Sequence, residues 1–271
     1  MCLLSGCFIL TEETESVPEQ TGAFATDGPP PASTEGPVNT DAPEYTLAPE
    51  PPALSDPDPL DSVLELSQAD FYAEAGKHID FYREIAFDSE YGTGTSKIRK
   101  WDYEPVFYIY PGEDADKYLP LIRDHIGDLC RIPGFPGFKY TDDPEEATLK
   151  LKFISAEEMD ELTSGYGEKA YGLTSITWLN FNCHIIRGEI YIVREADCSP
   201  EDVRHAVLEE LTQSMGLIND SYEFTDSIFY QGYSTTPGLS YIDWLMLRLH
   251  YAVEIDAGME YDEVLHVIDK P

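Results

Sequence analysis

Apolar and polar residues alternate most clearly from Ala147 to Ile154, where every second position is apolar and two of the others are lysines. A period of two is typical of a strand with one buried face. The apolar run Pro105 to Tyr110 predicts a second strand, which ends at Pro111-Gly112. Cys183 to Val193 predicts two short strands joined at Arg187-Gly188, at or near a sheet edge.

Helical spacing of apolar residues predicts helices between and after these strands. Four of them cover Asp61 to about Phe87, about 116 to 130, about 240 to 255, and 262 to 268. A fifth begins at Ser199-Pro200-Glu201-Asp202, which supplies an N-cap, a first-turn proline and a capping-box acid, and it ends at Gly216. This order of elements predicts an α+β fold with a mixed β-sheet packed on helices.

Composition divides the chain of 271 residues into two parts. More than half of its 20 prolines lie in residues 8–60, and no Lys or Arg occurs before Lys77. A segment rich in Pro, Thr and Glu cannot bury a core, so residues 8–60 are expected to form a disordered linker. Residues 61–271 have the length and the aromatic content of one globular domain. The net charge of −35 makes nucleic acid an improbable partner, because phosphates are repelled.

The N-terminus carries a candidate lipid attachment site. Leu4-Ser5-Gly6-Cys7 resembles the lipobox at which bacterial lipoproteins are cleaved and acylated on cysteine. Residues 1–7 would then be the remnant of a lipoprotein signal peptide, and lipid on Cys7 would hold the protein at the extracellular face of the cell membrane. The basic and apolar regions of a secretory signal do not precede it. Either the start is truncated or the match is accidental.

The remaining cysteines leave two alternatives open. Cys183 and Cys198 could form a disulfide in an oxidising compartment, with Cys130 unpaired. Three buried thiols acting as small apolar side chains are the other possibility.

The helix after Ser199 carries the candidate chemistry. Its apolar stripe lies on one side, and Glu209 and Gln213 lie on the opposite side. An acidic stripe of this kind is ordinarily solvated. However, the spacing Glu209-Glu210-x-x-Gln213-x-x-Gly216-x-x-Asn219-Asp220 resembles the H-E-x-x-H signature of zinc peptidases of the metzincin kind. The resemblance puts Glu210 in the general-base position and replaces the ligand histidines, which implies a zincin-like, metallopeptidase-like fold.

A second resemblance covers most of Phe71 to Pro271. It rests on several short motifs, which are Arg99-x-Trp101 before Pro105-Val106, the run from Glu209 to Asp220, Ser227-Ile228-Phe229, Asp243-x-x-x-x-Arg248-Leu249-x-Tyr251, and Gly258-Met259. The chain is similar in these motifs to a bacterial family called domain of unknown function 2927, many of whose members are called putative lipoproteins. The resemblance implies a location at the cell surface but no established reaction.

Metal binding by this altered helix stays open. Zinc favours imidazole and thiolate ligands, and a Glu209 carboxylate with a Gln213 amide is a poor zinc set. Oxygen ligands suit Ca²⁺, and Asn219 and Asp220 would add more of them. His205, one turn before Glu209, could supply one nitrogen ligand. The candidate cofactor is therefore a divalent cation, Ca or Zn, or none.

Two functions follow as hypotheses. The first is a lipid-anchored surface protein whose domain lacks catalysis and binds an extracellular peptide or another cell-envelope ligand, with a peptide lying along an edge strand near Ile190 to Val193. The alternative is a metal-dependent hydrolase that uses Glu210 as general base.

Overall fold

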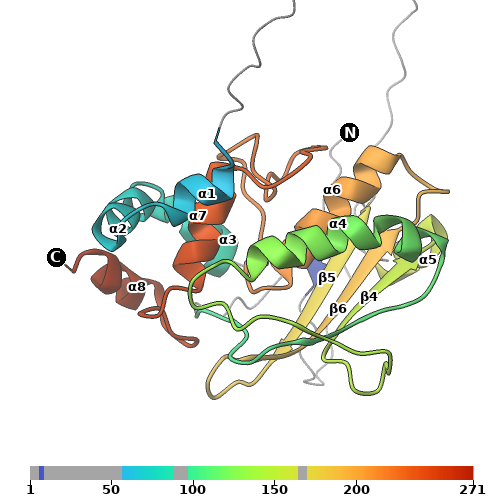
Figure 1. The fold of residues 1–271 in the computed structure, drawn as a ribbon, viewed down its shortest axis with the longest axis horizontal. Coiled ribbons are helices and arrows are strands. Elements are labelled where there is room, and N and C mark those ends of the chain that lie inside the picture. Colours follow the sequence, from blue (N-terminus) through green and yellow to red (C-terminus); the bar gives the residue numbers. More distant parts are fainter. Residues whose placement is uncertain (1–5, 9–56, 88–96, 164–169, 271) are drawn as a thin grey trace, which may run out of the picture. The chain divides into compact units, whose positions relative to one another are not determined.

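A six-stranded mixed β-sheet forms one layer of the protein (Figure 1). The computed structural model describes residues 6–8, 57–87, 97–163 and 170–270, all of which belong to one compact unit. The strands are β1 (Gly6–Phe8), β2 (Val106–Ile109), β3 (Lys139–Tyr140), β4 (Leu149–Ile154), β5 (Gly172–Trp178) and β6 (Ile185–Val193). Their order is β1-β5-β6-β4-β2-β3, and only β5 and β6 run antiparallel to each other.

Two long helices cover one face of this sheet. They are α4 (Glu113–Leu129) and α6 (Pro200–Gln213), which pack on each other and on β4, β5 and β6. The short helix α5 (Ala156–Leu162) lies on the opposite face, where Met159 packs on Val193. The α+β class with a mixed sheet packed on helices is therefore confirmed.

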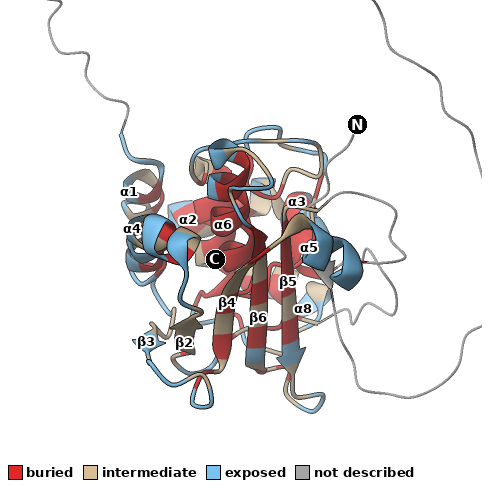
Figure 2. Ribbon diagram, turned by 90° about the vertical axis from the view of Figure 1, so that its right-hand side faces the viewer, coloured by how far each residue is buried: buried red, intermediate tan, exposed pale blue. Residues whose placement is uncertain are grey.

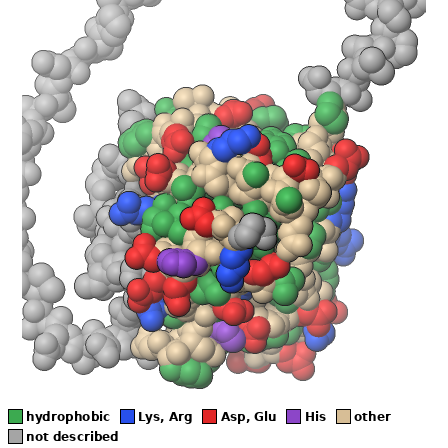
Figure 3. All heavy atoms as spheres, turned by 90° about the vertical axis from the view of Figure 1, so that its left-hand side faces the viewer, with side chains coloured by type: hydrophobic (Ala, Val, Ile, Leu, Met, Phe, Trp, Pro, Cys, Tyr) green, Lys and Arg blue, Asp and Glu red, His purple; other side chains and the backbone are tan. Residues whose placement is uncertain are grey.

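A second group of helices lies beside the sheet and shares its core. It contains α1 (Pro59–Leu64), α2 (Gln68–Lys77), α3 (Ile79–Phe87), α7 (Tyr241–His250) and α8 (Tyr261–Ile268). In Figure 1 these helices occupy the left-hand side of the molecule, and α7 contacts both α1 and α2. Figure 3 shows that acidic, basic and apolar side chains alternate on the outside of this group without one continuous charged patch.

The prediction of one helix from Asp61 to Phe87 is wrong, because the structure has three helices in this range. The Ser67 hydroxyl accepts a hydrogen bond from the Asp70 amide and begins α2 there. His78, with φ −117° and ψ 23°, separates α2 from α3. A serine that caps a new helix competes with continuation of the old one.

The turn expected at Arg187-Gly188 is also wrong. Gly188 lies inside β6, where an added Cβ would stand 2.5 Å from Leu149 Cδ1. The glycine therefore serves close strand packing and not a turn. Because β6 pairs with β4 on one side and β5 on the other, Ile190 to Val193 are not at an edge and cannot accept a peptide strand. The antiparallel partner of β6 is β5, a strand that the sequence did not reveal.

Of the two alternatives for Cys183 and Cys198, the structure has no disulfide between them, and both are free thiols. Cys183 precedes β6 and Cys198 follows it, so nine extended residues separate them. At about 3.3 Å per residue β6 is about 30 Å long, whereas a disulfide needs Cα atoms within about 7 Å. Cys183 is buried and behaves as a small core residue. Cys130 is a third free thiol.

No helix among the described residues combines the length and apolar character that crossing a bilayer requires. Leu4 and Ser5, which are half of the lipobox, and residues 9–56 of the linker lie outside the described residues.

Candidate functional site

The helix α6 forms as the sequence predicts. The Ser199 hydroxyl accepts from the Asp202 amide at 3.1 Å, and the Asp202 carboxylate accepts in return from the Ser199 amide at 3.2 Å. This capping box satisfies backbone donors at the helix start. At the other end Gly216 has φ +112°, a conformation that disfavours any residue with a Cβ.

The polar side of α6 is buried. Glu209 is 3 % exposed, and both Glu210 and Gln213 are fully buried. The expectation of an ordinary solvated acidic stripe therefore fails, and β5 covers this side at Glu210. A buried carboxylate is costly unless it has a structural or functional partner.

Glu210 lies directly beneath β5. A Cβ placed on Gly172 would stand 2.7 Å from Glu210 Cδ, so this carboxylate packs against a strand position without a side chain. Two residues along β5, the Thr174 hydroxyl donates to the Glu210 carbonyl at 2.8 Å. The backbone and the carboxylate of Glu210 are thus both fixed against β5.

Glu209 and His205 lie together on the next turns of the helix. Their Oε2 and Nε2 atoms are 3.5 Å apart, and His205 Nδ1 lies 3.3 Å from the Thr236 carbonyl. Burial lowers the pKa of His205, although the Thr236 carbonyl opposes this change. The Thr236 carbonyl and the Glu209 carboxylate can both only accept, so a neutral ring with one N–H donates to one of them and not to both.

Gln213, Asp220 and Asn219 do not converge on the same point. Gln213 Nε2 donates to Asp220 Oδ1 at 2.8 Å. Asn219 instead turns toward the end of α3, where its backbone amide donates to the Ile85 carbonyl at 3.2 Å. The helix motif thus forms two local pairs, His205 with Glu209 and Gln213 with Asp220.

These positions do not supply a metal centre by themselves. Within the described ranges, no group of three His, Cys, Asp or Glu side chains is placed to hold a metal ion. The amide nitrogen of Gln213 donates to Asp220, which fixes this side chain toward a carboxylate, and Asn219 faces α3. This donor set does not fit zinc or calcium.

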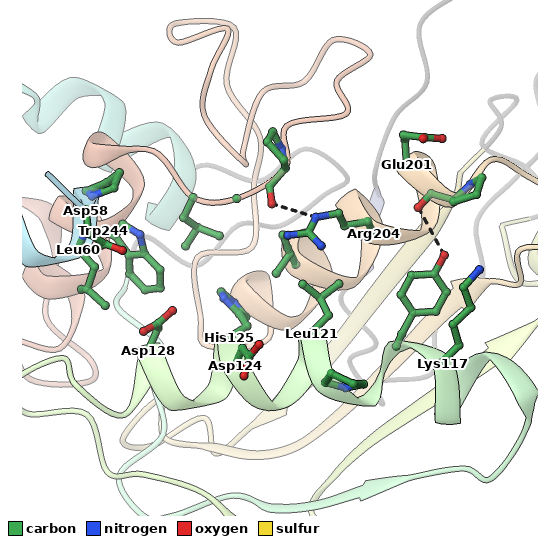
Figure 4. A pocket seen from close by; sticks show the side chains of 18 residues that line it. Asp58, Leu60, Lys117, Leu121, Asp124, His125, Asp128, Glu201, Arg204 and Trp244 are labelled. Carbon is green, nitrogen blue, oxygen red and sulfur yellow. Dashed lines mark hydrogen bonds between the residues drawn. The ribbon is translucent and has the colours of Figure 1, made fainter. Parts of the chain in front are cut away.

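A groove lies on the opposite side of α6, and no pattern in the sequence indicated it. It has a volume of about 680 Å³ and runs between α4, α6 and the start of α7 (Figure 4). Its lining includes the apolar side chains of Leu121, Leu208 and Trp244 and the carboxylates of Asp124 and Asp128. The groove uses the face of α6 that the candidate motif does not, so the two regions are separate.

The family assignment rests on a match over most of the chain. The family model described as protein of unknown function DUF2927 matches residues 76–270. The chain belongs to this family. No curated protein matches the chain.

Two motif residues of this DUF2927 domain fix the end of α6. Trp101 Nε1 donates to the Ser214 carbonyl at 3.0 Å, and the Tyr251 hydroxyl donates to the Met215 carbonyl at 2.8 Å. The last carbonyls of a helix lack partners within the helix, and these two side chains supply them. The geometry of α6 before Gly216 is therefore held from two distant parts of the chain.

Asp243 and Arg248 tie loops of the DUF2927 domain to α7. The fully buried carboxylate of Asp243 accepts from the Ser227 hydroxyl at 2.5 Å and the Ile228 amide at 2.9 Å. Burial outweighs these bonds and raises the pKa of Asp243 to about 6. Arg248 donates to the Leu66 carbonyl at 3.2 Å. Both residues hold backbone, so their place in the family motif has a structural explanation.

Proposed function

We propose that the protein is a lipid-anchored surface protein whose zincin-like domain binds an extended extracellular peptide without catalysis. The peptide would add a strand to the outer edge of β5. In strand addition, backbone hydrogen bonds supply affinity and side-chain pockets supply specificity.

One observation carries the proposal. Gly6–Phe8 forms the short strand β1, which pairs in parallel with β5 through Gly6 to Leu173, Cys7 to Thr174 and Phe8 to Ser175. This edge therefore accepts an extended segment next to the strand that covers Glu210. Cleavage at the lipobox would remove Gly6 from β1 and so free part of the edge for a ligand.

The order of elements around α6 supports the zincin-like comparison. The strand β6 leads into a capped helix, and a glycine with positive φ follows this helix at the spacing found in the metzincin signature. What differs is the donor set, because Glu209 and Gln213 stand where those peptidases have histidines. Loss of the imidazole ligands favours binding over hydrolysis.

Competition between a peptide and the protein's own β1 tests the proposal. A fluorescein-labelled peptide of residues 3–11 with Cys7→Ser should bind a chain lacking residues 1–11. It should bind the full chain at least about tenfold more weakly, because a tethered strand has a high effective concentration. Fluorescence anisotropy measures both affinities.

Peptides with methyl groups on alternate backbone nitrogens provide the matched control. One peptide is methylated at the odd-numbered backbone nitrogens and the other at the even-numbered ones. In one of them the N–H groups that face β5 are lost, so the affinity of that peptide should fall. Equal binding by both methylated peptides would show that strand addition is not the binding mode. Failure of the shortened chain to bind any of them would contradict the proposal.

The hydrolase alternative is favoured only by the position of Glu210 and by the contact of 3.5 Å between His205 and Glu209. Elemental analysis of the purified full chain, with hydrolysis of casein as the assay, decides between the two functions. The binding proposal predicts less than about 0.1 equivalent of a transition metal and no difference between wild type and Glu210→Gln. A stoichiometric metal together with hydrolysis that Glu210→Gln abolishes would establish the enzyme.

A further inference from the structure

The described residues cover the outer face of the sheet, opposite α4 and α6, only in part. There Met159 of α5 packs on Ile154 and Val193, near the ends of β4 and β6. Neighbouring strands β2, β4 and β6 are parallel, and parallel strands are ordinarily covered on both faces. Figure 2 looks onto this face, where β4, β6 and β5 lie in front of α6. Its remaining part is a surface that a ligand could cover.

A hollow of about 200 Å³ lies on this uncovered part, between β2, β4 and β6. We call it the sheet-face hollow, and it is lined by Tyr110, Lys150, Lys152, Glu189, Ile190 and Tyr191. Strand pairing sets Lys150 beside Glu189 and Lys152 beside Tyr191. Because side chains two residues apart point to the same face of a strand, both lysines reach this hollow. Its size suits a single sugar ring.

The two lysines have ammonium groups available for an anion. In the part of the chain that the structure describes, Lys150 lies within 4.0 Å of no carboxylate. Lys152 reaches only Glu158, at 3.8 Å, and its side chain is 44 % exposed. Two such cations on one strand stand out in a chain with a net charge of −35. They favour a ligand that carries negative charge.

The other side chains favour hydroxyl groups and a ring. The Tyr191 hydroxyl donates to Glu189 Oε2 at 3.1 Å, and the second carboxylate oxygen of Glu189 can accept from a ligand hydroxyl. Burial and the Glu189 charge raise the pKa of Tyr191 to about 12, so this hydroxyl keeps its proton at neutral pH. Tyr110 and Tyr191 present rings on which an apolar face of a sugar can stack.

We propose that the sheet-face hollow binds a carboxylated saccharide. Lys150 and Lys152 pair with the carboxylates of uronic acid units, Glu189 accepts from ring hydroxyls, and Tyr191 stacks on the ring. A simple phosphate would gain nothing from Glu189, and a neutral sugar would gain nothing from the lysines. This site is separate from the peptide edge of β5, so the two proposals stand or fall independently.

Isothermal titration of the full chain with tetragalacturonate tests the proposal. We expect saturable binding that becomes about tenfold weaker in Lys150→Gln/Lys152→Gln, since each exposed ion pair contributes modestly. The matched control is Lys77→Gln/Lys97→Gln, which removes the same charge on other elements and should bind as the wild type does. Tyr191→Phe should keep most of the affinity, whereas Tyr191→Ala should lose several-fold.

Thermal unfolding of each variant checks that it is folded at the temperature of the titration. Absence of binding, equal binding of the fully methyl-esterified tetramer, or equal losses in the two lysine pairs would each overturn the proposal. Displacement by an equal concentration of inorganic phosphate would also overturn it, because it would indicate a general anion site.

Discussion

His125 and His250 are held uncharged by their surroundings. Thr212 Oγ1 donates to the Leu208 carbonyl, so it accepts from His125 Nε2 at 2.9 Å. His250 Nε2 donates to the Arg99 carbonyl at 2.9 Å, which leaves Nδ1 to accept from the Tyr82 hydroxyl at 3.0 Å. Each network therefore selects one neutral tautomer. Burial lowers the pKa of both rings from 6.5 to about 3.

This burial makes stability fall in acid. Each ring contributes stability that is fully present above pH 6.5 and is lost as the pH falls toward about 3, because the unfolded chain binds the proton first. His125→Gln keeps a donor toward Thr212 but cannot titrate. We expect its free energy of unfolding, measured by urea denaturation, to fall less steeply than that of the wild type between pH 6 and pH 4. The difference should approach about 1.4 kcal/mol per pH unit.

Asp243 acts in the opposite direction, because its raised pKa favours the folded state as the pH falls below about 6. It is present in both proteins, so its contribution cancels in the comparison. Parallel stability curves for wild type and His125→Gln would contradict the prediction.

The burial of Glu209 and Glu210 could not be predicted from the sequence. Spacing alone placed both residues on the correct helix and Glu209 on its polar side. Their exposure depended on β5, whose residues Gly172 to Trp178 mix small, polar and apolar side chains without a clear period. One face of β5 is covered by a helix, and its edges pair with other strands. Such a strand needs no strict alternation of apolar and polar residues. The sequence therefore predicted the motif but not its enclosure.

Individual helices and strands were predicted correctly where the sequence contains a helix cap or a strict period of apolar residues. The capping box at Ser199 and the alternation of Leu149 to Ile154 both predicted elements close to those observed. The helix expected over residues 61–87 failed, because apolar spacing alone does not show that Ser67 begins a new helix. Gly188 likewise suggests a turn when only the sequence is considered, although the packing of Leu149 explains it.

The contact between β5 and α6 can be tested through Gly172. The Cβ that Gly172→Ala adds would overlap the buried Glu210 side chain, so this change should lower the free energy of unfolding by about 1–3 kcal/mol. In the background of Glu210→Ala, which removes that side chain, the same change should cost much less. Urea denaturation of the four proteins in this cycle measures the coupling.

Gly127→Ala serves as the control, because nothing lies within 4 Å of its added Cβ in α4. It should leave stability unchanged or raise it slightly. Additive effects of Gly172→Ala and Glu210→Ala would mean that the strand does not press on this carboxylate.

At the scale of the whole molecule, the sequence predicted the class of the fold but not the order of its strands. The parallel pairs of β4 with β2 and with β6 join segments that lie far apart in the chain. Such pairings leave little local trace, since each strand's pattern reports its burial and not its neighbour. Sites assembled from three strands, such as the sheet-face hollow, were therefore missed, although the basic side of β4 was visible.

Membrane attachment through Cys7 is the prediction that concerns the entire chain. The described residues contain no helix able to span a bilayer, and a net charge of −35 opposes adsorption to anionic lipid. The proposal of a lipid anchor predicts that attachment depends on acylation of Cys7. The protein is expressed in a bacterium behind a lipoprotein signal peptide. There, Cys7→Ser should abolish incorporation of labelled palmitate and move the protein from the membrane to the soluble fraction. Cys130→Ser, at an exposed free thiol, should change neither. A Cys7→Ser protein that stays with the membrane would require another anchor, because one acylated cysteine could not explain it.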